Sequence, residues 1–420
     1  MFDKIIFHID VNSAFLSWEA VHRMEHLKEK RDLRVMVSAV GGDMSKRHGI
    51  ILAKSISAKR FGIRTGESIP EALQKCPNLY LVPPNYGLYE RCSKAFIDTL
   101  REYSSCVEQY SIDEAYVDMT ETAELWGGPV ESAQRMREQI FRELGFTVNI
   151  GISGNKLLAK MASDFEKPNK VHTLFREEIP EKMWGLPVSE LFFVGRATAR
   201  KLLNLGIRTI GELACTDPDI LKSHLKKHGE VIWAFANGLD VSVVESEPAP
   251  NKGYGNSTTV PFDVVDISTA NLVLMGLAET VATRMRRDKV KAEVISVGIK
   301  YEDFTHISHQ CILENPTNIT KELTQMASQL FEEVWSGKPV RHLGVHAGRV
   351  VDEAVMRQIK LFDDTDYEKL ERMDQTVDQI RRRFGIDAVK RASFVNSPID
   401  HLSGGISREK RSVDYKKLGL

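Results

Sequence analysis

Three acidic residues, far apart in the chain, stand where their side chains could bind metal ions. Asp10 ends the apolar segment Lys4–Asp10, which is typical of a buried strand, while Asp113 and Glu114 lie at the centre of the alternating segment Val107–Asp118. Buried acids without partners are costly, so packing alone does not explain such a set. Two Mg²⁺ ions about 3.5–4 Å apart would stabilise it, activate a hydroxyl nucleophile and stabilise a leaving phosphate group. The three acids therefore predict a two-magnesium site.

Each acid also has a simpler explanation when taken by itself. Asp10 alone would be a helix cap, and Asp113 with Glu114 alone would be an exposed turn, so the prediction depends on the combination. Adjacent residues of a strand point to opposite faces, so the two neighbours cannot bind the metals in the same way. We expect Asp113 to bridge both ions with Asp10, and Glu114 to reach only the catalytic ion from a kinked backbone.

The elements that would position these acids alternate between strands and helices over the first 165 residues. Their expected ranges are strands 4–10, 34–40 and 147–152, a hairpin over 107–118, and helices over 12–24, 86–103 and 151–165. This order predicts a mixed sheet that is covered by helices.

The remainder of the chain divides into segments of different character. In order, these are an all-helical segment over 170–240, a Glu- and Pro-rich linker over 241–250, a second α/β sandwich over 253–349, and a polar tail over 351–420 with a helix at 366–384. A length of 420 residues is itself too great for one core, and two to four domains are expected.

Composition excludes several classes of protein. Hydrophobic residues make up 42 % and charged residues 27 %, as in ordinary globular proteins, and no apolar run is long enough for a membrane helix. With no secretory signal at its N-terminus, the chain is expected to be cytoplasmic, with no membrane partner. The five cysteines form no CxxC pair, so neither a zinc site nor a disulfide framework is expected.

A net charge of −1 does not by itself indicate nucleic-acid binding, which needs only local basic clusters. One cluster could contact phosphates or could equally be a solvated helix end. Its members are Arg284, Arg286, Arg287, Lys289 and Lys291.

Two longer segments resemble the signatures of the Y-family translesion DNA polymerases. The first is Ser111–Asp118, and the second begins at Gly151-Ile152-Ser153-Gly154-Asn155-Lys156 and continues through residues 159–164 to Lys167-Pro168-Asn169. Asp10-Val11-Asn12 and Phe15 resemble the same family. The resemblance covers about residues 4 to 350, in matching order.

The resemblance implies an α+β, multidomain, right-hand polymerase. Its expected parts are a palm (1–10 and 80–168), small fingers (11–79), a helical thumb (169–240) with a helix-hairpin-helix at 191–207, a linker (241–250), an α/β little finger (251–350) and a tail (351–420). It further implies primer–template DNA and deoxynucleoside triphosphates as substrates.

The resemblance also implies roles for individual residues. Asp10, Asp113, Glu114 and the carbonyl of Val11 would be ligands of the two Mg²⁺ ions, and the three acids would be catalytic. Phe15 falls at the steric-gate position, where an aromatic ring leaves no room for a 2′-hydroxyl. Binding of the nucleotide is implied for Lys59, Arg60 and Lys167.

The sequence departs from the family pattern at several positions. Ile56 replaces a tyrosine whose hydroxyl usually holds the triphosphate, so a weaker grip on the nucleotide is expected. Lys59 stands where arginine is frequent, and Ala197 replaces the second glycine of the hairpin. Asn12 replaces an aspartate common in the polymerase IV branch and resembles the polymerase V catalytic subunit, so both branches remain open.

Gln358-Ile359-Lys360-Leu361-Phe362 resembles the short motif by which bacterial polymerases bind the sliding clamp. Leu361 and Phe362 would fill an apolar pocket, and Gln358 would form a hydrogen bond at its rim. The motif is usually close to the C-terminus, whereas 58 residues follow it here.

Template-directed DNA synthesis in damage tolerance is therefore the expected function. Two alternatives are a nucleotide cyclase, which also places paired carboxylates on a palm sheet, and a non-catalytic accessory protein that binds DNA and the clamp.

Overall fold

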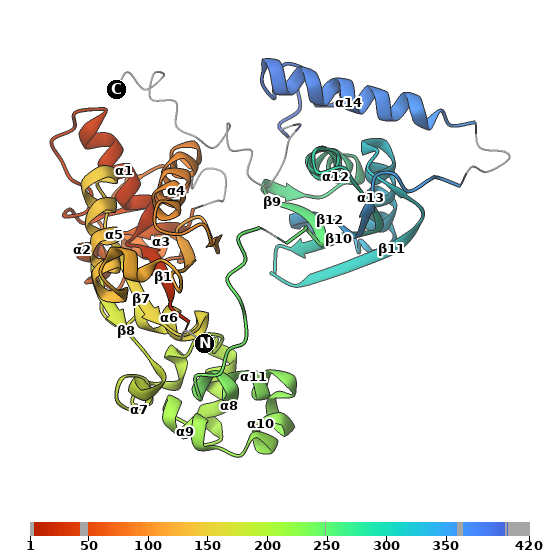
Figure 1. The fold of residues 1–420 in the computed structure, drawn as a ribbon. Helices are drawn as coiled ribbons and strands as arrows, with labels where there is room; N and C mark the ends of the chain where they lie inside the picture. The colour runs from red at the N-terminus through yellow and green to blue at the C-terminus, as the bar shows by residue number, and fades with distance from the viewer. Residues whose placement is uncertain (1–3, 43–48, 248, 359–363, 400, 402–420) are drawn as a thin grey trace. The chain divides into compact units, whose positions relative to one another are not determined.

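The computed structural model describes residues 4–42, 49–247, 249–358, 364–399 and 401 (Figure 1). Its chain forms two compact units, which meet in sequence at residues 248 and 249. None of the helices in these described ranges has the length and apolar character needed to cross a membrane.

A five-stranded sheet forms the centre of the first unit. Its order is β5-β6-β1-β7-β8, and all neighbouring strands are antiparallel except β7 and β8. The strands are β1 (Ile6–Val11), β5 (Val107–Gln109), β6 (Glu114–Asp118), β7 (Val148–Ser153) and β8 (Val171–Thr173). Every residue of β1 is buried, as expected for a central strand covered on both faces.

Helices cover both faces of this sheet, as the alternation of elements predicted. They are α1 (Ala14–Glu25), α4 (Tyr86–Arg101), α5 (Pro129–Leu144) and α6 (Lys156–Ser163). Phe7, Ile9 and Val11 share a core with α1, α4 and α5, whereas His8, on the opposite face of β1, bonds Ser163 of α6. Glycine is required at Gly151, because a Cβ there would lie 2.0 Å from the carbonyl oxygen of Ala159.

A smaller sheet with its own core lies between β1 and α4 in sequence. Its order is β3-β2-β4, and its elements are β2 (Ser38–Gly41), β3 (Ile51–Lys54), β4 (Tyr80–Val82), α2 (Ile56–Lys59) and α3 (Ile69–Lys75). The strand predicted over 34–40 begins only at Ser38. Asp32 accepts hydrogen bonds from both the backbone amide and the guanidinium of Arg34, which holds this stretch in a turn.

Residues 170–240 are mainly helical, as predicted, and their apolar residues share a core with α6. The helices are α7 (Ile179–Lys182), α8 (Arg196–Asn204), α9 (Ile210–Cys215), α10 (Pro218–Leu225) and α11 (Lys227–Ala236). The exception is β8, which pairs with β7 and so belongs to the main sheet. Its three residues are too few to produce a recognisable alternation.

The second unit is built on a four-stranded antiparallel sheet of order β11-β10-β12-β9. The elements are β9 (Gly253–Val264), β10 (Val290–Tyr301), β11 (His306–Thr317), β12 (Val340–Asp352), α12 (Ile267–Arg287) and α13 (Thr320–Val334). Alternate strand residues pack with both helices in one core. The predicted α/β sandwich is therefore present, with its helices on one side of the sheet.

The polar tail also contains a folded element, α14 (Tyr367–Phe384), which packs against α12 (Figure 1). Buried ion pairs join the two helices: Arg286 binds Asp374 at 3.2 Å and Asp378 at 2.7 Å, and Arg381 binds Glu279 at 2.6 Å. Within the basic cluster, Arg286 is thus a structural residue, and neither a phosphate contact nor a solvated side chain.

We expect Glu279→Ala to lower the free energy of unfolding by about 3–5 kcal/mol, because it leaves a guanidinium buried without its counter-charge. Arg381 loses its carboxylate partner in this variant, whereas Arg391, which lies 3.1 Å from Glu279, keeps Asp374 at 3.5 Å. Urea unfolding of the full chain measures the effect. The matched control is Asp98→Ala, which removes an exposed acid paired with Lys94 and should change stability by less than about 1 kcal/mol. Equal stability of the two variants would contradict the role given to the buried pairs.

Candidate active site

The register between β1 and β6 brings the three predicted acids together. Asp10 lies directly opposite Glu114, the first residue of β6. The amide of Val11 donates to the carbonyl of Asp113, immediately before β6, at 3.0 Å. Residues directly opposite in an antiparallel pair share a face, so the side chains of Asp10 and Glu114 point to the same side. Residues more than 100 positions apart thus converge at one end of two adjacent strands.

Asp10 is buried, with 9 % of its surface exposed, and its carboxylate is bonded to the ammonium group of Lys167. Lys167 also pairs with Asp164 at 2.8 Å. Burial raises the pKa of Asp10 to about 6, although the charge of Lys167 opposes the shift. In Lys167 the two acids outweigh the effect of burial and raise the pKa of the ammonium group.

Glu114 is bound by a second lysine. Lys160 of α6 donates to its carboxylate at 3.1 Å, and Nε2 of the fully buried His8 lies 3.7 Å away. Burial acts against ionisation here, but these two neighbours hold the pKa of Glu114 down at about 2. Lys160 and His8 are contacts that the sequence analysis did not assign. The signal in the sequence for Lys160 was its place in segment 159–164, which is part of the resemblance to the family.

Asp113 sits in the turn that precedes β6. The hydroxyl of Ser111 donates to its carboxylate at 2.8 Å and accepts from the amides of Asp113 and Glu114 at 3.3 and 3.1 Å. Burial raises the pKa of Asp113, and the charge of Glu114 adds to the shift. The backbone bends in this turn, immediately before Glu114 at the start of β6.

The donors at this site suit Mg²⁺, which prefers oxygen ligands. In the described ranges, no three acidic, histidine or cysteine side chains are already arranged around a common point as a metal site would be. The lysines occupy the carboxylates instead, Lys167 on Asp10 and Lys160 on Glu114. The raised pKa values of Asp10 and Asp113 reflect a cost of burying negative charge that a bound cation would relieve.

Asn12, one of the departures from the family pattern, supports the loop that carries Lys167. Its side-chain oxygen accepts from the hydroxyl of Thr147 at 3.0 Å and from the amide of Asn169 at 2.9 Å. Its amide group donates to Asn149 at 3.2 Å. An aspartate could accept the first two bonds but could not donate the third, so asparagine satisfies more of this site.

The predicted gate residue, Phe15, lies in the first turn of α1 and is half-buried. Its ring stacks on that of Tyr89 with centroids 4.4 Å apart and planes 9° apart. Tyr89, like Lys160 and His8, was not predicted from the sequence as part of the site.

The remaining predicted nucleotide contacts lie on and after α2. Lys59 ends this helix and Arg60 caps it, and both side chains are exposed. Ile56, at the position of the missing tyrosine, is 51 % exposed, so an aliphatic group faces solvent where a hydroxyl would be expected.

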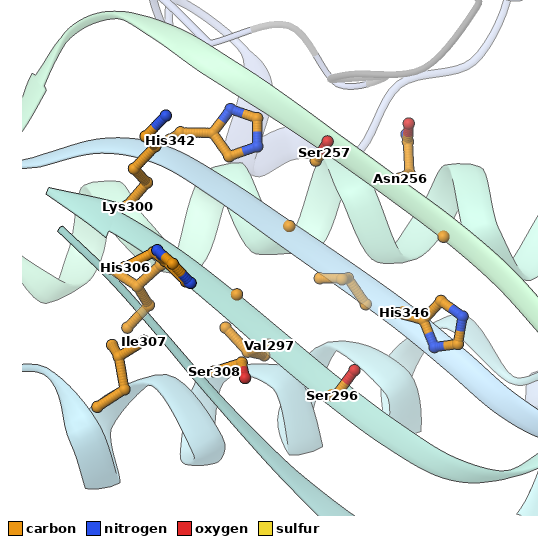
Figure 2. Close-up of a pocket in the computed structure, with 15 residues that line it drawn as sticks. Asn256, Ser257, Ser296, Val297, Lys300, His306, Ile307, Ser308, His342 and His346 are labelled. Atoms are coloured by element: carbon orange, nitrogen blue, oxygen red, sulfur yellow. The ribbon is translucent and has the colours of Figure 1, made fainter. Parts of the chain in front are cut away.

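In the second unit, the sheet face without helices is hollowed by a depression of about 610 Å³ (Figure 2). Residues within the predicted little-finger range contribute to it, such as Ser257 of β9 and Lys300 of β10. Histidines, hydroxyl groups and glycines predominate in its lining. Its main polar members are Asn256, Ser257, Ser296, Lys300, His306, Ser308, His342 and His346. Small residues and donors of this kind suit close contact with phosphates.

The proposed clamp motif is only partly described. Gln358 is exposed and its backbone is held by Asn315, which accepts from its amide at 2.7 Å and donates to its carbonyl at 3.1 Å. Leu361 and Phe362 lie outside the described residues.

Comparison with known proteins agrees with this architecture. Residues 9–164 match the impB/mucB/samB family, residues 251–361 match the C-terminal domain of that family, and residues 176–207 match its HHH motif. DNA polymerase IV of Clostridium acetobutylicum is 43 % identical over 93 % of this chain and 98 % of its own length. DNA polymerase IV 1 of Bacillus subtilis is 35 % identical over 99 % of both chains.

A solved Y-family DNA polymerase chimera shares the fold, with a TM-score of 0.70 and 22 % identity over 83 % of this chain and 99 % of its own. The right-hand polymerase fold and the helix-hairpin-helix are therefore confirmed. The chain belongs to the Y family of DNA polymerases.

Proposed function

We propose that this protein is a template-directed DNA polymerase that performs translesion synthesis by nucleotidyl transfer with two Mg²⁺ ions. The observation that carries the proposal is the pairing of Asp10 with Glu114, with Asp113 beside them, at the end of two central strands of a Y-family fold. Relatives named DNA polymerase IV support the polymerase IV branch over the polymerase V branch.

The carboxylates of Asp10, Asp113 and Glu114 and the carbonyl of Val11 are the proposed ligands that would hold the two ions, and Glu114 would bind the ion beside the primer. Bound Mg²⁺ would lower the pKa of the primer 3′-hydroxyl and neutralise charge on the pyrophosphate. The protein contributes mainly by holding the hydroxyl and the α-phosphate in line.

The two lysines give the site charge balance before a nucleotide arrives. Lys167 is bonded to Asp10, so a cation bound at Asp10 would release its ammonium group to the triphosphate. A point charge on a flexible stem suits a phosphate that later leaves as pyrophosphate. Lys59 and Arg60 are proposed to bind the same triphosphate, and Ile56 provides no hydroxyl to help them.

The domains are proposed to follow the family. The five-stranded sheet is the palm, the three-stranded sheet with α2 and α3 the fingers, the helices α7–α11 the thumb, and the second unit the little finger. β4 belongs to the three-stranded sheet, so the fingers extend to Val82. The hollowed sheet face of the second unit would then contact the DNA backbone.

The cyclase alternative loses its support, because a cyclase needs neither the helix-hairpin-helix nor the second unit. The accessory-protein alternative remains an outcome of the next experiment.

We expect Asp113→Asn to reduce primer extension by at least about a thousandfold, because it removes a charge that interacts with both metals. Single-nucleotide incorporation with Mg²⁺ measures this, and binding of primer–template DNA should remain unchanged. The control is Asp118→Asn at the opposite end of β6, which should retain activity. If wild type and Asp113→Asn extended a primer equally poorly, the accessory role would be correct.

Phe15→Ala should admit ribonucleotides, because it removes the ring that would exclude a 2′-hydroxyl. We expect the preference for deoxynucleotides, taken as the ratio of kcat/KM values, to fall roughly 100-fold. The control is Phe141→Ala on α5, an exposed aromatic residue of the same unit. If Phe15→Ala kept the wild-type preference for deoxynucleotides, Phe15 would not be the steric gate.

We also propose that Gln358, Leu361 and Phe362 bind the sliding clamp. The double variant Leu361→Ala/Phe362→Ala should bind purified clamp with an affinity lower by about 100-fold or more, because no apolar side chains would fill the pocket on the clamp. Surface plasmon resonance measures the affinity, while primer extension without the clamp should stay at the wild-type level. Retained affinity in the double variant would place the clamp contact elsewhere.

A further inference from the structure

Glu19 is a buried carboxylate that has no part in the chemistry proposed above. It lies in α1, one helical turn after Phe15, and none of its surface is exposed. Burial of an acid is costly unless hydrogen bonds and an opposite charge stabilise it, so its contacts indicate its role.

Both oxygens of Glu19 are engaged. The hydroxyl of Tyr89 on α4 donates to Oε1 at 3.1 Å, and Nε of Arg23 donates to Oε2 at 3.3 Å. Arg23 in turn donates to Glu29 at 3.1 Å. Arg23 therefore balances the charge of Glu19, and Glu19 fixes the position of the Tyr89 hydroxyl.

That tyrosine is the residue on which the proposed gate rests. The ring of Phe15 lies parallel to the ring of Tyr89, and Trp18 packs against both rings with centroids 5.9 Å away. Tyr89 is itself fully buried. The orientation of Phe15 thus follows the orientation of Tyr89, which the bond to Glu19 holds.

We propose that Glu19 and Tyr89 are positioning residues for sugar discrimination. The Glu19 carboxylate fixes the Tyr89 hydroxyl, and the Tyr89 ring holds Phe15 in the position where it excludes a 2′-hydroxyl. This inference rests on the gate function proposed for Phe15. A steric gate discriminates only if its ring is held in place. A shift of the Phe15 ring by about 1 Å would make room for the 2′-hydroxyl oxygen.

The simpler alternative is that Glu19 only joins α1 to α4. A matched control distinguishes the two. Tyr103 follows α4, is likewise buried, and donates its hydroxyl to Gln139 at 2.8 Å, while its ring packs on Trp126. Tyr103→Phe therefore removes the same kind of hydrogen bond from the same unit at a place away from Phe15.

The experiment measures kcat and KM for one deoxynucleotide and its ribonucleotide opposite the same template base. Tyr89→Phe should lower the preference for the deoxynucleotide about fivefold, the effect of losing one hydrogen bond. The change should appear as a lower KM for the ribonucleotide. Tyr103→Phe should keep the wild-type preference.

Two variants of the acid complete the set. Glu19→Gln retains an oxygen that accepts from Tyr89 and should keep a preference close to wild type, whereas Glu19→Ala should lower it at least as far as Tyr89→Phe. The thermal unfolding temperature of each variant shows whether a change in sugar preference accompanies a change in stability.

An unchanged preference in Tyr89→Phe, with a large loss in Phe15→Ala, would overturn the inference and leave the gate intact. Equal losses in Tyr89→Phe and Tyr103→Phe would also overturn it, because the effect would then be general. If Phe15→Ala itself kept the wild-type preference, the gate assignment would fail, and this inference with it.

Discussion

The structure depends on one constraint, which is that carboxylates of like charge must be held close together in a largely buried place. The register of β1 and β6 sets Asp10 against Glu114, and the turn closed by Ser111 adds Asp113. Such a group is stable only beside positive charge. Lys167 and Lys160 provide it in this structure, and Mg²⁺ is proposed to take over at least part of that role.

Other residues of the first unit hold Lys160 and Lys167 in position beside the acids. Gly151 lets α6 approach β7 closely, which brings Lys160 over the sheet face that Glu114 occupies. Asn12 holds the loop after α6, so that Lys167 reaches Asp10. On the opposite face of β1, apolar residues form a core with the helices that carry Phe15 and its support. One face of β1 thus carries the charged residues of the site, and the other packs against the aromatic cluster that contains Phe15 and Tyr89.

The second unit combines an open sheet face with a tail that is an integral part of its fold. The hollowed face carries hydroxyl, histidine and lysine side chains, which suit the contact with a nucleic-acid backbone proposed above. On the helical side, α14 contributes acids to Arg286 and an arginine to Glu279. Residues after 361, where the match to the family's C-terminal domain ends, therefore add buried charge pairs to the second unit.

The sequence alone was sufficient for the family and for most of the order of elements, because these reside in long local motifs and strong periodicities. Asp10, Asp113 and Glu114 could be proposed as metal ligands from their residue types and the motifs around them, and the register of β1 and β6 brings them together. Tertiary structure alone decided which lysine binds which acid, that Tyr89 and Glu19 support Phe15, that Arg286 is buried, and that β8 joins the sheet. These depend on contacts between residues distant in sequence, and a side chain's burial and partner are set by register and packing rather than by its neighbours along the chain.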